Sequence, residues 1–149
     1  MADNTFQKIE KSEERLYGPP CILVCGYPAD EQESIRSLFA SCGLSGHPVV
    51  FAGEDDGDTL LGELVKQESG KGRDLSSGLA RAIIMSGFTQ NELHSLLSSY
   101  RKEKFEQQLW ATLTPVSEGW TLRDLLKELR AEAEAFKRRQ AQQGAEKGK

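Results

Sequence analysis

Four carboxylate side chains cluster at one point of the chain, and their chemistry would be the binding of a hard cation. Glu54, Asp55, Asp56 and Asp58 lie close together, and carboxylate oxygens are preferred ligands of Mg²⁺ and Ca²⁺. With Asp30, which follows an earlier apolar run, they would support a divalent-metal-dependent enzyme acting through carboxylates at strand ends. No carboxylate occupies the closing position of an EF-hand loop. A solvated turn that caps the next helix is the simpler interpretation, so we predict no metal site and no cofactor.

Nucleophilic catalysis has little support in the sequence. The two histidines, His47 and His94, are near no obvious serine or cysteine nucleophile, so we assign no catalytic residue. Cys21 and Cys25 lie four residues apart in a predicted strand and therefore share a face. Because a buried cysteine behaves as a small hydrophobe, we expect inert core thiols in a reducing cytoplasm.

Two apolar runs end in the same way, at a glycine followed by an aromatic residue. An amphipathic segment follows each turn, which is the pattern of a strand, a tight turn and a helix at the opening of a βαβ unit. Unbroken apolar runs are typical of strands covered on both faces, in the middle of a sheet. The runs are Ile22 to Cys25, with the turn Gly26-Tyr27, and Ile83 to Ser86, with the turn Gly87-Phe88-Thr89.

These elements divide the chain into two similar halves, which we interpret as an internal repeat. Residues 21–67 and 81–136 each read as a βαβα unit, with 68–80 as the linker. Residues 1–20 form an N-terminal extension, and 137–149 are predicted to be a disordered tail because they are almost entirely polar. With three residues fewer in the second turn, the apolar positions of the first helix (Ile35, Leu38, Phe39, Cys42) are matched with Leu93, Leu96, Leu97 and Tyr100.

The predicted fold is an α/β sandwich around one four-stranded, mainly parallel sheet of order 2-1-3-4, with helices on both faces. In open α/β sheets, ligands bind in the crevice outside the carboxyl ends of the strands, at the switch point. We therefore predict that the two turns line one crevice and that its backbone amides could hold an anion. The predicted ligand-binding residues are Gly26, Tyr27, Gly87, Phe88 and Thr89.

The second half also resembles a known family. The run Ile83 to Phe88, the segment Ala111 to Thr114 and the helix start Trp120-Thr121-Leu122 are similar to the bacterial domain of unknown function 3783, over roughly Ala82 to Glu132. This resemblance implies a bacterial, cytosolic α/β protein and assigns no activity, cofactor or catalytic residue.

Composition limits the classes of function further. The formal net charge of -4 argues against broad nucleic-acid binding, which needs a positive field. No window approaches the apolar length of a membrane span, so we expect a soluble, cytoplasmic protein. The favoured function is a non-enzymatic binding or regulatory module. Its partner is left open between an unidentified protein, a second copy of the chain and a small polar ligand.

Overall fold

The protein is described by a computed structural model that covers residues 15–44, 46–67, 79–103 and 108–147, with side chains to residue 141. The elements are β1 (Cys21–Cys25), α2 (Ala29–Ser41), β2 (Val49–Ala52), α3 (Leu61–Leu64), β3 (Ala82–Ser86), α4 (Gln90–Lys102), β4 (Leu109–Thr112) and α5 (Leu122–Lys147). Short 3-10 turns at Glu54–Asp56 and Ser117–Gly119 precede α3 and α5. Most of the predicted linker, residues 68–78, lies outside the described residues.

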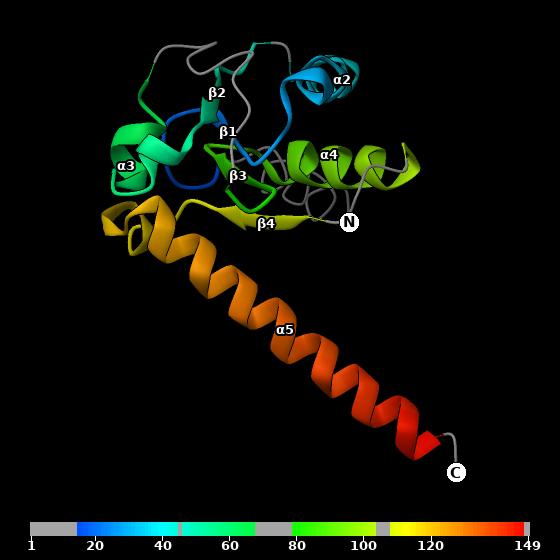
Figure 1. Ribbon diagram of the computed structural model, residues 1–149. Helices are drawn as coiled ribbons and strands as arrows, with labels where there is room; N and C mark the ends of the chain where they lie inside the picture. Colours follow the sequence, from blue (N-terminus) through cyan, green and yellow to red (C-terminus); the bar gives the residue numbers. More distant parts are fainter. Residues whose placement is uncertain (1–14, 45, 68–78, 104–107, 148–149) are drawn as a thin grey trace, which may run out of the picture.

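All four strands form one sheet of order β2-β1-β3-β4, which confirms the predicted order (Figure 1). β1 pairs with β2 in parallel, and β3 pairs with β4 in parallel. The apolar runs therefore lie at the centre of the sheet, as their unbroken hydrophobicity predicts.

The central pair is antiparallel, and here the structure corrects the arrangement on which the predicted crevice depends. Cys21 lies opposite Ser86, and Cys25 lies opposite Ala82. The end of β1 is therefore beside the start of β3. The two units are related by an approximate two-fold axis normal to the sheet, the symmetry by which two like subunits most often associate.

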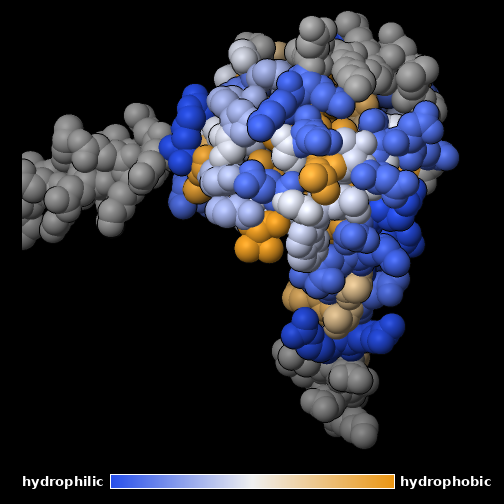
Figure 2. Space-filling model, turned by 90° about the vertical axis from the view of Figure 1, so that its left-hand side faces the viewer, coloured by the Kyte–Doolittle hydropathy of each residue, from blue (hydrophilic) through white to orange (hydrophobic). Residues whose placement is uncertain are grey.

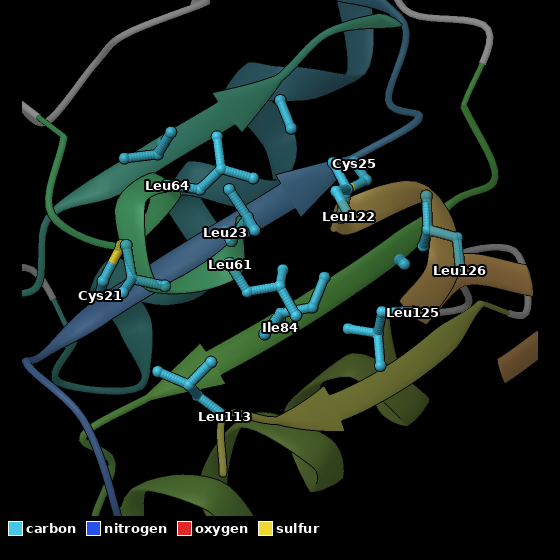
Figure 3. Close-up of a cluster of buried hydrophobic side chains, with 14 residues drawn as sticks. Cys21, Leu23, Cys25, Leu61, Leu64, Ile84, Leu113, Leu122, Leu125 and Leu126 are labelled. Atoms are coloured by element: carbon cyan, nitrogen blue, oxygen red, sulfur yellow. The ribbon is translucent and has the colours of Figure 1, made fainter. Parts of the chain in front are cut away.

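Helices cover both faces of the sheet, and each face has its own apolar core. On one face, side chains of α2 and α4 pack on Ile22, Val24, Ile83 and Met85. On the other face, shown in Figure 3, leucines of α3 and α5 pack on Cys21, Leu23, Cys25 and Ile84. Alternate residues of each central strand thus enter opposite cores, which is why no position in these runs is polar until Ser86.

The two units have the same element order, and most counterparts are separated by a constant interval. β1 and β3 begin at residues 21 and 82, α2 and α4 at 29 and 90, and α3 and α5 at 61 and 122, which is 61 residues each time. This interval replaces the helix alignment predicted above, because Ile35 now corresponds to Leu96 and Phe39 to Tyr100. All four of these side chains are buried, so no shortening of the second turn is needed.

α5 is longer than its counterpart α3 and continues beyond the body of the protein (Figure 1). Thr121 begins it as predicted, since its hydroxyl oxygen accepts a hydrogen bond from the Asp124 backbone N–H at 3.2 Å. Leu122, Leu125 and Leu126 anchor its first turns in the core. The helix continues to Lys147, where we expected a disordered tail after Phe136.

Candidate functional site

The two glycine turns lie at opposite ends of the central strand pair and do not line a common crevice. Because β1 and β3 are antiparallel, Gly26 follows Cys25 at one end, whereas Gly87 follows Ser86 at the other. Both glycines have positive φ angles, 73° and 67°, as a tight turn after a strand requires. The shared crevice is therefore wrong, while ligand binding by either turn separately stays a prediction.

The second turn, Gly87-Phe88-Thr89, is covered by residues 15–20. Gly87 N–H donates to the Tyr17 carbonyl at 3.0 Å, and Leu16 N–H donates to the Phe88 carbonyl at 2.7 Å. The Arg15 guanidinium donates to the Gly87 carbonyl at 2.7 Å. The N-terminal extension thus uses the backbone groups that we expected to face a ligand.

The N-terminus of α4 is already satisfied by a carboxylate of the protein itself. Thr89 N–H donates to Glu92 Oε1 at 2.8 Å, and Glu92 N–H donates to Thr89 Oγ1 at 3.1 Å, which makes a capping box. His47 Nε2 lies 3.3 Å from Glu92 Oε2, and the His47 ring contacts Phe88 edge-on at 5.2 Å. An external anion at this helix end would have to displace Glu92.

The first turn supports a polar cluster at the opposite end of the strands. The buried Tyr27 hydroxyl donates to Gln108 Oε1 and lies 3.5 Å from the Tyr100 hydroxyl. Arg81 stacks over the Tyr27 ring, with its guanidinium carbon 4.4 Å from the ring centroid, and donates to Glu31 Oε2 at 2.7 Å. Tyr27 therefore fixes two side chains, Arg81 and Gln108, which come from residues immediately before β3 and β4.

These two residues line a cavity of about 470 Å³ between this end of the sheet and α5. The remaining lining residues come from the same strand ends and from one side of α5; the full lining is Ala80, Arg81, Gln108, Leu109, Arg130, Ala133, Glu134 and Lys137. Cavities of this size fall in the range that binds small organic ligands. We call it the edge cavity.

A buried donor of the edge cavity has no partner in the described structure. Gln108 Oε1 accepts the Tyr27 hydroxyl, but Gln108 Nε2 is buried and makes no hydrogen bond among the described residues. Leaving a buried polar group unpaired costs about 1–3 kcal/mol, so such groups are uncommon in native proteins. An acceptor oxygen supplied from the cavity would satisfy this amide.

Electrostatics keep the cluster in a defined charge state. Burial raises the pKa of Tyr27 far above its ordinary value, and its hydrogen bond to Tyr100 adds to this effect, so the phenol stays protonated. For Arg81, burial lowers the pKa, but the hydrogen bond and charge of Glu31 outweigh it and raise the pKa overall. The edge cavity therefore presents a permanent cation beside a neutral donor.

The carboxylate cluster is used within its own turn and in an ion pair to α5. Asp56 Oδ2 accepts from Gly53 N–H at 2.8 Å, and Asp58 pairs with Arg123. Within the described ranges, no three histidine, cysteine, aspartate or glutamate side chains lie close enough to hold a metal ion.

Both core cysteines are where the sequence places them. Cys21 and Cys25 are fully buried free thiols on the face covered by α3 and α5 (Figure 3). Burial raises the pKa of Cys21 to about 12 and raises that of Cys25 as well. A thiolate nucleophile is therefore disfavoured at both positions.

Comparison with known proteins gives one result, which covers the second unit. Residues 81–136 match a family model described as a domain of unknown function (DUF3783). These residues are a DUF3783 domain. The DUF3783 match begins at Arg81, includes Gln108, Arg130, Ala133 and Glu134, and so supplies most of the edge cavity. No curated protein and no solved structure matches the chain.

None of the helices in the described ranges combines the length and apolar character that crossing a membrane requires. Figure 2 shows a mainly hydrophilic surface in that view, with separate hydrophobic side chains and a hydrophilic α5. The exposed large hydrophobic residues of the described part include Leu60, Val116, Trp120 and Phe136.

Sequence reasoning missed the lining of the edge cavity, although it selected the neighbouring Gly26 and Tyr27. A Cβ at Gly26 would lie 2.5 Å from the Leu79 carbonyl oxygen, so this turn packs directly against the chain entering β3. Arg81 and Gln108 each precede an apolar run in the sequence, which was the available signal. Only the antiparallel direction of β3 brings them beside Tyr27.

Proposed function

We propose that this protein is a non-enzymatic binding module that takes a small polar ligand in the edge cavity. The observation that carries the proposal is Gln108, a cavity residue whose buried Nε2 donor lacks a partner while its Oε1 is held by Tyr27. A preformed cavity with a few fixed polar groups is the usual form of a small-molecule site.

The lining supports binding rather than catalysis. It contains no histidine, cysteine, serine or threonine, and its one carboxylate, Glu134, is on the exposed part of α5. General acid–base or nucleophilic chemistry needs a titratable or nucleophilic group at the reacting atom. The lining instead supplies hydrogen-bond donors and apolar surface from Ala80, Leu109 and Ala133.

A titration followed by protein NMR tests the proposal. The full chain is mixed in turn with AMP, citrate, adenosine, glucose and spermidine, which span anionic, neutral and cationic polar chemistry. We expect at least one of them to shift the amide signals of Arg81, Gln108, Leu109 and Ala133 in a saturable way. If none of the five shifts this group of signals, the proposal fails.

A matched pair of variants locates the binding. Ala133→Trp fills the edge cavity, whereas Ala135→Trp adds the same side chain to an exposed position of α5 outside it. The Ala133→Trp variant should lose the signal shifts, and the Ala135→Trp variant should keep them. Equal responses from both variants would place the ligand elsewhere and contradict the proposal.

Origin and setting belong to the same proposal. The constant interval of 61 residues between counterpart elements supports a duplication of one βαβα unit. A bacterial, cytoplasmic setting follows from the family resemblance and from the buried free thiols, which suit a reducing compartment. Fractionation of cells that express the native protein tests the location, and recovery outside the soluble cytoplasmic fraction would contradict it.

A further inference from the structure

Positive side chains approach the edge cavity from two directions. Arg81 comes from the sheet and is held by Tyr27 and Glu31, while Arg130 and Lys137 come from α5. Glu134 is the one acidic residue among the eight that line the cavity. Counting Glu31, which pairs with Arg81 from outside the lining, the local balance remains positive by one charge.

The two cations of α5 are not neutralised by the protein. Arg130 and Lys137 are exposed, and neither forms an ion pair to another residue of the described part of the chain. They lie seven residues apart, which is two helical turns, and therefore project from the same side of the helix. Their charges are available to a ligand that enters beside Gln108.

This positive region is a local exception in an acidic protein. Residues 1–129 contain 13 basic and 20 acidic side chains, whereas residues 130–149 contain six basic and three acidic ones. The overall charge of -4 gives no general attraction for anions. A cationic cavity on an otherwise acidic chain concentrates the attraction for anions in one place.

We infer that the ligand of the edge cavity is an anion whose oxygens accept hydrogen bonds from Gln108 Nε2 and the cations of α5. This inference rests on the proposed binding function and specifies its ligand class: a small organic phosphate or carboxylate. Both groups offer the acceptor oxygens and the negative charge that an amide donor beside arginine and lysine would recognise.

AMP and adenosine test the role of charge, because they differ only in the phosphate group, and citrate represents the carboxylates. Binding is measured by calorimetry on the full chain at low and at physiological salt. We expect AMP or citrate to bind, adenosine to bind at least about tenfold more weakly than AMP, and added salt to weaken the anion. The arm that binds more tightly identifies the source of the oxygens.

Two double variants with the same change in charge form the control. Arg130→Gln/Lys137→Gln removes the cavity cations, and Arg138→Gln/Arg139→Gln removes two cations from the same helix outside the cavity. The first should weaken the anion roughly tenfold or more, and the second about twofold at most. Thermal melting of both variants verifies that each is folded.

The outcomes separate the two proposals. Tighter binding of adenosine, glucose or spermidine than of either anion, located at Arg81 and Gln108, would overturn the anionic ligand and leave the binding module standing. Equal weakening by the two double variants would also overturn the ligand class, since the effect would then come from overall charge. Absence of binding by all five compounds would remove both proposals.

Discussion

Leu23 lies directly opposite Ile84 at the centre of the sheet, one residue from each unit. Both side chains are fully buried and enter the core covered by α3 and α5 (Figure 3). The pair is separated by the same 61 residues as the counterpart elements, so it lies on the approximate two-fold axis. A second such pair, Leu60 and Thr121, forms an antiparallel bridge next to the starts of α3 and α5.

Truncation at this pair should destabilise both units at once. We expect Ile84→Ala to lower the free energy of unfolding by about 2–5 kcal/mol, because it leaves a cavity where the units meet. Val116→Ala is the control, since Val116 is 70% exposed and should change stability by about 0.5 kcal/mol at most. Urea unfolding measures both, and a similar small effect of the two substitutions would contradict a shared core.

The glycine turns predict a graded series of alanine substitutions. At Gly26 and Gly87 a Cβ would meet backbone atoms at 2.5 and 2.6 Å and the φ angle is positive, so each substitution should cost more than about 2 kcal/mol. Gly43 has a positive φ angle but open space, and should cost about 1 kcal/mol. Gly119, with open space and no positive φ, should be nearly neutral. Urea midpoints that do not follow this order would refute the assignment.

Removal of the Tyr27 hydroxyl should expose the role of this residue in holding the edge cavity. Tyr27→Phe leaves the ring under Arg81 but takes the donor from Gln108 Oε1. We expect a loss of about 1–3 kcal/mol, the cost of an unpaired buried polar group, together with shifted amide signals at Gln108. Tyr17→Phe, at a residue that is 41% exposed, is the control. An unchanged Gln108 environment would show that Tyr27 does not position it.

The core thiols predict a loss of stability at alkaline pH. Burial raises the pKa of Cys21 from 9.0 to about 12, so the folded chain keeps a proton that the unfolded chain releases from pH 9 upward. Stability is therefore fully present below pH 9 and falls as pH rises toward 12, by up to about 1.4 kcal/mol per pH unit for each such thiol.

Urea midpoints at pH 8, 9 and 10 measure this fall. A Cys21→Ala/Cys25→Ala variant should show a shallower decline, because lysine, tyrosine and other groups then supply the whole pH dependence. Parallel declines in the variant and the unsubstituted protein would mean that the thiols do not titrate as their burial requires.

The two tryptophans should differ in access to a quencher. Trp110 is half-buried and packs edge-on against Tyr100 at 5.0 Å, whereas Trp120 is 37% exposed. We expect acrylamide to quench the Trp110→Phe variant, which keeps Trp120, more steeply than the Trp120→Phe variant. Identical slopes would be inconsistent with these environments.

Local sequence patterns predicted the elements well and their relative direction poorly. The unbroken runs around Val24 and Ile84 identified central strands, and both residues are buried in one sheet. The glycine after each run identified the turn. Nothing in either run records which way the strand points, because a buried strand has the same apolar pattern in both directions.

The direction of β3 determines which residues form the candidate site. Reversal of that strand moves Gly87 away from Gly26 and brings Arg81 beside Tyr27. The contribution of α5 was equally hidden, because Arg130 and Lys137 belong to a segment with few apolar residues after Leu129. Their relevance depends on the helix continuing past the sheet, which propensity alone did not establish.

The anchoring of α5 at one end gives the helix the mechanics of a lever. With 1.5 Å of rise per residue, about 25 Å of helix extends beyond its leucine anchor, so a tilt of roughly 10° would carry the tip some 4 Å. The edge cavity is at the fulcrum of this lever, between the anchored turns and the free arm. A wedge of small dimensions placed there would therefore be read out as a large displacement at the far end of the chain.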